Sequence, residues 1–183
     1  MDGPQPTLLT ERLLLRPFAA ADAPAVRRLA GERAVADTTL AIPHPYPDGV
    51  AAEWIATHAS KYAAGAEANF AVTLAPAGEL IGAMGLMVTP AHLRAELGYW
   101  IGVPFWGRGY ATEAGRAVVA FGFDQLGLHR IQAHYLTRNP ASGRVLAKLG
   151  MRLEGIHRHA IRKWDIFEDL AHVAILATER ERA

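Results

Sequence analysis

Apolar positions near the start of the chain follow first a strand-like and then a helix-like spacing. Three leucines among charged neighbours predict an opening strand over residues 8–17. Asp22 and Pro24 are residue types expected at a helix cap and in the first helical turn, and Val26 and Leu29 then share one face. A first helix therefore follows the first strand.

A proline-rich stretch separates this helix from a second one. Residues 39–49 contain three prolines at alternate positions, which forbids helix and favours an extended, exposed loop. From roughly Val50 to Ala64 the apolar residues return at helical spacing, and Gly65 is expected to end this second helix. The apolar set consists of Ala51, Trp54 and Ile55, with His58 on the same face.

The middle of the chain is predicted to be a three-stranded antiparallel meander. Apolar runs at residues 70–74, 80–88 and 95–101 are separated by Pro76-Ala-Gly78 and by Thr89-Pro90. Helix and strand then alternate: a helix over 110–125, a strand over 130–137, a helix from Asn139-Pro140 to Gly150, and two strands over 152–162 and 165–176 joined around Lys163-Trp164.

The predicted order is β-α-α-β-β-β-α-β-α-β-β, which fits neither a regular doubly wound fold nor a barrel. We expect an α/β protein of mixed α+β type, with one mixed, mostly antiparallel sheet covered by helices on both faces. The 183 residues contain no repeat, low-complexity tract or long linker, so residues 1–183 are predicted to form a single domain.

The amino-acid composition limits which classes of function the protein can have. Nineteen basic and eighteen acidic residues give a net charge of +1, so no overall field would attract nucleic acid or an anionic membrane. The start of the chain does not resemble a signal peptide, and no apolar run approaches the about 18 residues of a membrane span. We therefore expect a soluble cytoplasmic protein.

The chain contains no cysteine. This excludes disulfides, thiolate zinc sites and iron–sulfur clusters, and it also excludes a thiol nucleophile. Acyl chemistry, if it occurs here, does not pass through a cysteine-bound intermediate.

A glycine-rich turn, Ile101-Gly-Val-Pro-Phe-Trp-Gly-Arg-Gly109, leads from a predicted strand directly into a helix. Free backbone N–H groups and the positive end of the helix dipole would point into this turn, which favours a phosphate or pyrophosphate ligand. A tight turn without a ligand explains the same glycines. Gly107-Arg-Gly109 lacks the third glycine of a dinucleotide fingerprint, and no Gly-Lys-Ser/Thr exists, so neither NAD nor ATP is favoured.

Three ordered segments resemble one family. Residues 95–114, Ala-Glu-Leu-Gly-Tyr-Trp-Ile-Gly-Val-Pro-Phe-Trp-Gly-Arg-Gly-Tyr-Ala-Thr-Glu-Ala, are similar to the acetyl-CoA motif of GNAT superfamily N-acetyltransferases, in the RimJ/RimL-like ribosomal-protein branch. Residues 137–150 with Leu153-Glu-Gly155 resemble that branch's second signature, and Thr10–Pro17 its start. Trp106 stands where the general superfamily has Gln or Arg, but tryptophan is common in this branch.

The resemblance implies a set of cofactor contacts. Backbone groups of Ile101 and Val103 would bind the pantetheine arm of acetyl-CoA, and Asn139 would hold the arm further along. The pyrophosphate would be wrapped by Arg108, Gly109, Tyr110, Ala111 and Thr112. Related proteins are often homodimers, which is an expectation here as well.

Direct transfer requires a neutral amine, an activated thioester and a proton for the departing thiolate. The matched position of Ser142 implies that it protonates or hydrogen-bonds the thiolate and contacts the cofactor, although a serine there also suits a helix cap. Tyr135 on the preceding strand is the alternative proton donor. Glu96 is the candidate base, acting directly or through water; otherwise it is a solvated carboxylate or a partner of Arg94. Glu113, in the first helical turn, is interpreted as structural.

Other polar and aromatic residues remain open in role. His157 and His159 would face the same way on a strand, but no third ligand or His-Glu-x-x-His run is evident, so we predict no metal site. Four aromatic residues come from elements that could close over an acceptor or pack in the core or at a dimer interface. These are His44, Tyr46, Trp54 and Trp164.

The sequence thus predicts an enzyme that moves an acetyl group from acetyl-CoA to a primary amine, in a protein N-terminus or a small molecule, within a ternary complex. The alternative is a CoA-binding regulatory module of the same fold without turnover. A hydrolase with Ser142 as nucleophile is a third reading, but Pro140-Ala-Ser-Gly-Arg144 lacks the Gly-x-Ser-x-Gly elbow.

Overall fold

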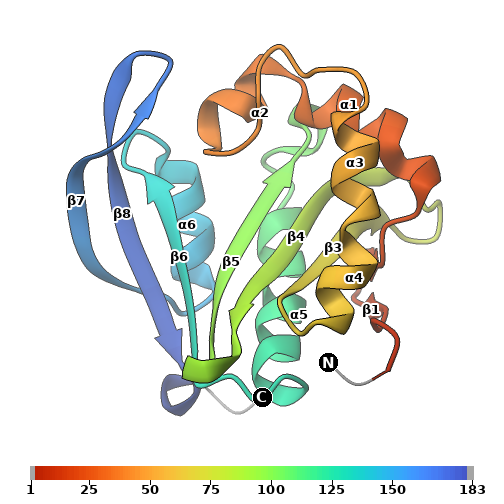
Figure 1. Cartoon of the computed structure of the whole chain (residues 1–183). Coiled ribbons are helices and arrows are strands. Elements are labelled where there is room, and N and C mark those ends of the chain that lie inside the picture. The colour runs from red at the N-terminus through yellow and green to blue at the C-terminus, as the bar shows by residue number, and fades with distance from the viewer. Residues whose placement is uncertain (1–2, 181–183) are drawn as a thin grey trace.

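The computed structural model describes residues 3–180, which contain one eight-stranded sheet in the order β1-β2-β3-β4-β5-β6-β8-β7 (Figure 1). Every neighbouring pair is antiparallel except β5 and β6, which are parallel. The expected mixed, mostly antiparallel sheet is confirmed. The strands are β1 Leu8–Leu9, β2 Leu13–Arg16, β3 Glu67–Leu74, β4 Leu80–Thr89, β5 Arg94–Ile101, β6 Arg130–Leu136, β7 Arg152–Lys163 and β8 Ile166–Leu176.

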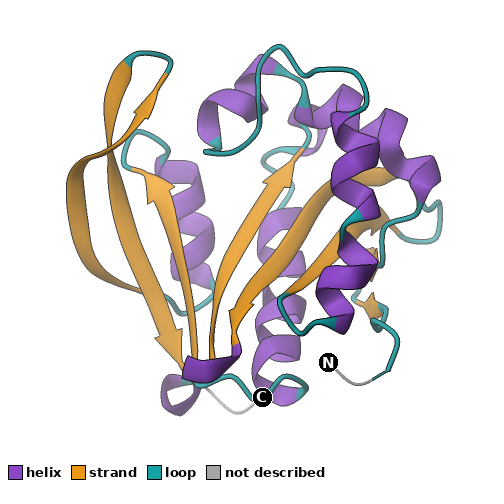
Figure 2. Ribbon diagram, in the orientation of Figure 1, coloured by secondary structure: helices purple, strands orange, loops and turns teal. Residues whose placement is uncertain are grey.

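Helices cover both faces of the sheet (Figure 2). They are α1 Ala23–Ala30, α2 Arg33–Thr38, α3 Val50–Ala56, α4 His58–Ala63, α5 Tyr110–Asp124 and α6 Pro140–Lys148. The larger hydrophobic core lies between the sheet and the α5–α6 layer, and includes Phe70, Val118 and Leu146. A second core lies under α1 and α3 on the other face, where Ala71 and Trp100 are buried. Because α1–α4 cover β3, β4 and the end of β5 on that face, the face of β6 and β8 stays uncovered (Figure 1).

The parallel pair β5–β6 separates shortly after it begins. The two strands are paired only from Arg94 to Glu96 on β5 and from Arg130 to Gln132 on β6. Beyond these residues β5 continues beside β4, and β6 continues beside β8, so a wedge opens between them (Figure 1). The sheet therefore has an opening between the carboxyl ends of β5 and β6.

The first predicted strand is wrong in one respect, because residues 8–17 form a hairpin rather than one strand. The Oγ1 atom of Thr10 accepts a hydrogen bond from the Leu13 amide at 3.0 Å, and the Thr10 amide donates to the Leu13 carbonyl at 2.9 Å. These bonds close a turn that folds β1 back on β2. Leu13 and Leu15 of β2 are fully buried, as their alternation requires.

The helical region between β2 and β3 also differs from the prediction. Helix α2 was not expected, because its six residues bury only the adjacent Val35 and Ala36 and show no helical period. The predicted helix over residues 50–64 is interrupted at Thr57, whose amide and hydroxyl both donate to the Trp54 carbonyl, at 3.2 and 2.8 Å.

Asp22 lies at the N-cap position of α1, as expected, but its side chain makes no capping hydrogen bond to that helix. Its carboxylate accepts from the Ala19 amide at 2.8 Å and from two nitrogens of Arg16 at 2.7 and 2.8 Å. It therefore closes the preceding 3₁₀ turn, Ala20–Asp22, and ties that turn to β2. Pro24 does lie in the first turn of α1, as predicted.

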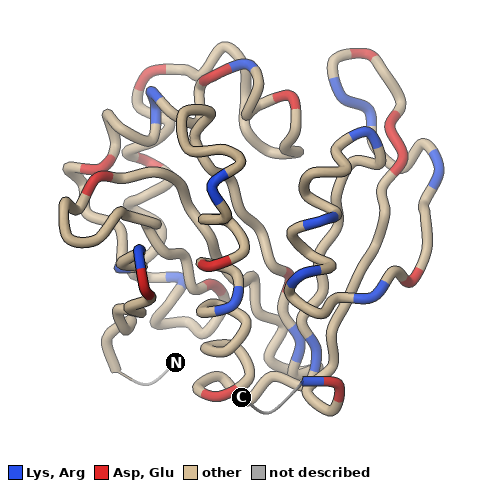
Figure 3. Tube along the Cα trace, turned by 180° about the vertical axis from the view of Figure 1, so that it is seen from behind, with Lys and Arg blue, Asp and Glu red and all other residues tan. Residues whose placement is uncertain are grey.

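Basic and acidic positions are both distributed along the whole trace seen from behind (Figure 3). None of the helices in the described part of the chain has the length and hydropathy needed to cross a bilayer.

Candidate functional site

The turn before α5 presents a row of free backbone donors. Gly107 and Gly109 have φ values of +74° and +82°, which glycine adopts without strain, and they turn the chain into the helix. The amides of Trp106 and Glu113 donate to Val103 and Gly109 carbonyls. Within the described residues, the amides of 107–112 donate to no protein acceptor. Together with the helix dipole they suit an anion.

Contacts from the first hairpin hold this turn in place. The carboxylate of Glu113 accepts from Thr10 Oγ1 at 2.6 Å, from the Arg12 amide at 2.8 Å and from Arg12 Nε at 2.7 Å. Arg12 also donates to the Arg108 carbonyl at 3.1 Å. Glu113 therefore joins the start of α5 to the β1–β2 turn, as its structural interpretation expects.

A cavity of about 350 Å³ lies against the turn, between α2, α5 and α6. Its basic side chains are Arg144 and Lys148, and none of the described residues that line it is acidic. The lining includes seven of the predicted cofactor residues: Ile101, Gly109, Tyr110, Ala111, Thr112, Asn139 and Ser142. Val103 and Arg108, also predicted to contact the cofactor, are outside this lining.

Two predicted cofactor residues already make hydrogen bonds within the protein. The Ile101 carbonyl accepts from the Trp106 indole Nε1 at 2.6 Å, so the tryptophan side chain fixes the turn to the end of β5. Asn139 caps α6: its Oδ1 accepts from the Ser142 amide at 3.3 Å. The predicted start of α6 at Asn139-Pro140 is confirmed, and Ser142 is held in its first turn.

Ser142 forms a pair with a tyrosine that the sequence analysis did not single out. The Tyr99 hydroxyl lies 2.7 Å from Ser142 Oγ. Burial raises the pKa of Tyr99 to about 12, although the Ser142 hydrogen bond lowers it in part. The phenol therefore keeps its proton and can donate a hydrogen bond at any physiological pH.

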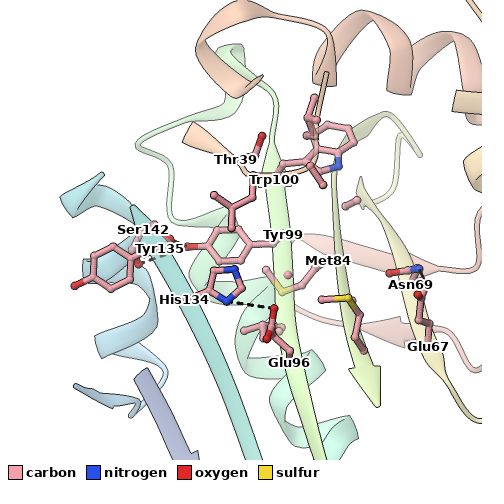
Figure 4. Close-up of a pocket in the computed structure, with 18 of the residues that line it drawn as sticks. Thr39, Glu67, Asn69, Met84, Glu96, Tyr99, Trp100, His134, Tyr135 and Ser142 are labelled. Carbon is pink, nitrogen blue, oxygen red and sulfur yellow. Dashed lines mark hydrogen bonds and ion pairs between the residues drawn. The ribbon is translucent and has the colours of Figure 1, made fainter. Parts of the chain in front are cut away.

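Tyr135, the alternative proton donor, is placed differently. Its ring packs on α6, where a Cβ added at Gly143 would lie 2.8 Å from the Tyr135 hydroxyl. In Figure 4 that hydroxyl points away from the side on which Glu96 and His134 lie. Of the two tyrosines, Tyr99 is the one that contacts Ser142.

A second cavity, of about 400 Å³, lies around the wedge and contains Glu96, His134, Glu67 and Lys61 among its lining residues (Figure 4). The two cavities share five lining residues: Thr38, Thr39, Tyr99, Trp100 and Ser142. The Tyr99–Ser142 pair thus borders both, and a ligand in the first cavity would meet one in the second beside this pair.

Glu96 is paired with His134 rather than with Arg94. Its Oε1 lies 3.2 Å from His134 Nδ1, and its Oε2 accepts from Gln132 Nε2 at 3.5 Å. The hydrogen bond from His134 lowers the pKa of Glu96, and the same bond raises the pKa of His134. The pair is half-buried on the uncovered face of the sheet.

The sequence analysis found Glu96 and Ser142 but missed their partners Tyr99 and His134. Each residue had a signal in the sequence. Tyr99 lies three residues after Glu96 inside the segment that resembles the acetyl-CoA motif, and His134 lies two residues after Gln132, on the same face of the adjacent strand. What the sequence lacks is the β5–β6 pairing, which brings position 96 beside position 132.

The histidines of β7 do not share a face as expected. His159 has a φ of +49° and lies in a register shift between His157 and Ile161, which disrupts the alternation of a regular strand. His157 stacks on His172 with ring centroids 4.0 Å apart, while His159 lies on Phe167 at 5.8 Å. Among the residues the structure describes, no group of three or more His, Cys, Asp or Glu side chains could hold a metal ion.

The four aromatic residues named as acceptor-site candidates separate into different environments. Trp54 lines the second cavity and packs edge-on against Phe18 and His58, with centroids at 5.1 and 4.4 Å. His44 and Trp164 face each other at 6.2 Å. Tyr46 packs on the α1–α3 core.

Two basic side chains, Arg138 and Lys163, connect α2 and its following loop to the β6–β8 side of the molecule. Arg138 contacts Asp37 of α2 at 2.9 Å and Glu168 of β8 at 2.7 Å. Lys163, at the end of β7, is buried and donates to the Thr39 carbonyl at 2.6 Å. Thr38 and Thr39, which line both cavities, are therefore held by the opposite side of the wedge.

Comparison with known proteins gives consistent matches. The Acetyltransferase (GNAT) domain family matches residues 12–152. Uncharacterized N-acetyltransferase p20 of Bacillus licheniformis is 32% identical over 154 residues, covering 83% of this chain and 85% of p20. Uncharacterized N-acetyltransferase YoaA of Bacillus subtilis is 46% identical over 81 residues, covering 44% of this chain, and the match spans only 46% of YoaA.

Solved structures share the fold. Mycobacterium smegmatis RimJ in complex with CoA-disulfide has a TM-score of 0.86 at 24% identity, and the match covers 98% of this chain and 91% of that chain.

Proposed function

The chain belongs to the GNAT acetyltransferase family, and on that premise we propose that it transfers an acetyl group from acetyl-CoA to a primary amine. The observation that carries the proposal is the turn before α5. Its amides at residues 107–112 are free of protein acceptors and open beside a cavity that combines Arg144 and Lys148 with no described acidic lining residue. This arrangement fits a pyrophosphate.

The residues of the first cavity would hold acetyl-CoA, with Gly109 to Thr112 at the pyrophosphate and Asn139 and Ile101 along the arm. Acetyl-CoA supplies a carbonyl activated by its thioester and a thiolate leaving group. The Tyr99–Ser142 pair would stabilise the departing sulfur by hydrogen bonding, because it borders both cavities and Tyr99 retains its proton. No cysteine is present to carry the acyl group, which supports direct transfer in a ternary complex.

The second cavity would receive the amine, which we propose to be a protein N-terminus or a small-molecule amine. Its carboxylates, Glu96 and Glu67, would attract a cationic ammonium group, although Glu67 is already paired with Lys61 at 2.9 Å. Glu96 together with the imidazole of His134 would form the base on this side.

The proposal is tested by measuring CoA binding by calorimetry and CoA thiol release with a panel of N-terminal peptides, polyamines, amino acids and aminoglycosides. Gly109→Glu should abolish CoA binding, because it places a negative charge in the anion site and strains a residue with positive φ. Gly127→Glu is the matched control: Gly127 also has positive φ, +63°, but no atom lies within 4 Å of its Cβ position and it lines neither cavity.

Unaltered CoA affinity in Gly109→Glu would contradict the assigned anion site. CoA binding by the unmodified protein without thiol release from any amine would leave a non-catalytic CoA-binding module instead of an enzyme.

A further inference from the structure

Three histidines lie in a row beside Glu96 on the uncovered face of the sheet. His134 of β6 and His172 of β8 are directly paired across the strands, with ring centroids 5.7 Å apart. His157 of β7 continues the row, 4.0 Å from His172. Of the three, only His134 lines the second cavity, and it does so together with Glu96.

The contact with Glu96 determines how His134 presents its ring. Nδ1 lies 3.2 Å from Glu96 Oε1, so a neutral imidazole places its proton on Nδ1 and donates it to the carboxylate. Gln132 holds the other carboxylate oxygen at 3.5 Å. The second ring nitrogen, Nε2, then carries a lone pair and points away from Glu96, on the side of Tyr99 (Figure 4).

The two groups of this pair differ in their ability to take a proton from an amine. Hydrogen bonding from His134 lowers the pKa of Glu96, which makes the carboxylate a weaker base than an ordinary glutamate. The same bond raises the pKa of His134, in opposition to burial, and so makes the imidazole a stronger base than it would be without Glu96. A proton taken from the amine is therefore bound more readily by the His134 imidazole than by the Glu96 carboxylate.

Neighbouring groups do not oppose a positive charge on His134. Burial lowers the pKa of His172, which therefore stays neutral, and its Nε2 is buried without a hydrogen-bond partner in the described structure. Beyond it, Glu154 of β7 is bound by Arg130 of β6 at 2.6 Å. Across the cavity, Glu67 is paired with Lys61. Tyr99 is held protonated.

Resting on the proposed acetyl transfer, we infer that His134 is the catalytic base and that Glu96 is its positioning residue. The ammonium form of the acceptor gives one proton to His134 Nε2, and the freed nitrogen lone pair forms the C–N bond with the acyl carbon. The C–S bond breaks with its electron pair on sulfur, which receives the second nitrogen proton. His134 then releases its proton to solvent, so the reaction yields amide, thiol and one proton.

The inference is tested first without turnover. Two-dimensional NMR of the imidazole ¹⁵N resonances gives the pKa of His134 in the unmodified protein and in Glu96→Gln. We expect a lower His134 pKa in Glu96→Gln, because the carboxylate that stabilises the imidazolium is removed. A His134 pKa that does not change in Glu96→Gln overturns the inference regardless of activity.

The second test is the pH profile of kcat/KM. His134→Gln should reduce kcat/KM by about 10²- to 10³-fold and remove its rise with pH, with CoA affinity retained. Glu96→Gln should keep much of the activity and shift the rise to lower pH, because a less basic His134 loses its proton earlier. His157→Gln, an exposed member of the same row, is the matched control and should behave as the unmodified protein.

The outcomes separate this inference from the proposed function. A normal pH profile in His134→Gln, or loss of the rise only in Glu96→Gln, would overturn the role of His134 while leaving the acetyltransferase intact. If His134→Gln fails to bind CoA, the shift of the His134 pKa in Glu96→Gln decides by itself whether the inference holds. Absence of thiol release in the unmodified protein refutes the proposed function, and this inference with it.

Discussion

At the scale of single residues, the Tyr99–Ser142 pair borders both the cavity at α5–α6 and the cavity at the wedge. A phenol with a pKa of about 12 is a poor proton source but a permanent hydrogen-bond donor. Its expected contribution is therefore stabilisation of negative charge on the departing sulfur, with Ser142 as the nearest hydroxyl, 2.7 Å away.

We predict that Tyr99→Phe and Ser142→Ala each reduce kcat by about 10- to 100-fold, the loss expected for one hydrogen bond to a charged group. The double variant should lose little more than either single variant, because the two hydroxyls act as one unit. Thiol-release kinetics measure kcat, and calorimetry checks that CoA affinity is kept. A large loss in Tyr135→Phe and none in Tyr99→Phe would assign the donor to Tyr135 instead.

His58 offers a prediction about stability. It is buried among Phe18 and Trp54, both ring nitrogens lack partners in the described structure, and burial lowers its pKa to about 4. In the unfolded chain the His58 imidazole takes up a proton near pH 6.5, whereas in the folded chain it stays neutral down to about pH 4. His58 therefore permits full stability above pH 6.5, and stability falls as the pH drops from 6.5 to 4.

Over that interval the loss should reach at most about 3 kcal/mol. His58→Phe should flatten this part of the profile, because the phenyl ring has no charge to desolvate. Urea unfolding at several pH values measures it, and an unchanged slope in His58→Phe would assign the acid sensitivity to other groups.

The sequence singled out candidate residues in local turns and helix starts, and did not single out residues whose contacts depend on sheet pairing. Gly109, Asn139 and Ser142 lie within turns or helix starts that the local sequence predicts, and the structure places all three on one cavity. Tyr99 and His134 acquire their partners through the β5–β6 wedge and the packing of α6, which no local pattern encodes.

At the scale of elements, close strand packing makes Gly82 and Gly98 a matched pair. A Cβ at Gly82 of β4 would lie 2.3 Å from the Trp100 carbonyl oxygen of β5, so the backbone would have to shift. At Gly98, on the uncovered part of β5, no atom lies within 4 Å of the added Cβ.

Gly82→Ala should therefore destabilise the protein by about 1–3 kcal/mol, the usual cost of overpacking. Gly98→Ala should be neutral or stabilise slightly, by about 0.5 kcal/mol, since alanine restricts the unfolded chain more than glycine does. Chemical denaturation of both variants checks this. Equal stability of the two would mean that β4 and β5 can move apart without cost.

Helices and strands were predicted well where the apolar residues keep one period over a long segment. They were predicted poorly where a side chain hydrogen-bonds to nearby backbone and so ends the element. Helix α5 and the β3–β5 meander carry sustained patterns and match their predicted positions. The errors at Thr10 and Thr57 share a cause, because in both cases a threonine hydroxyl bonds to nearby backbone and so ends or interrupts the element. Helix α2 is too short to show a period.

At the scale of the whole molecule, Arg138 and Lys163 connect α2 and its loop to the far side of the wedge. We predict that Arg138→Ala raises the KM for both substrates several-fold, because Thr38 and Thr39 line both cavities and would lose their support. Cleavage within residues 40–49 in limited proteolysis should become faster. Arg162→Ala, which removes only the exposed Arg162–Asp165 pair, is the matched control.

Identical KM values and cleavage rates in Arg138→Ala and Arg162→Ala would show that the substrates do not depend on this connection. The pairing of α2 with β8 involves residues far apart in the chain, and it could not be read from the sequence, which left residues 39–49 as an unattached loop.

The short pairing of β5 with β6 has a consequence for the order of events. The first cavity lies against α5 and α6, and the second lies around the wedge, so under the proposed function acetyl-CoA and the amine would occupy separate cavities that meet at the Tyr99–Ser142 pair. Initial-rate measurements should therefore show random addition of the two substrates, with intersecting double-reciprocal plots. CoA should compete only with acetyl-CoA, and the acetylated product only with the amine. A strictly compulsory order of substrate addition would mean that one cavity forms only after the other is filled.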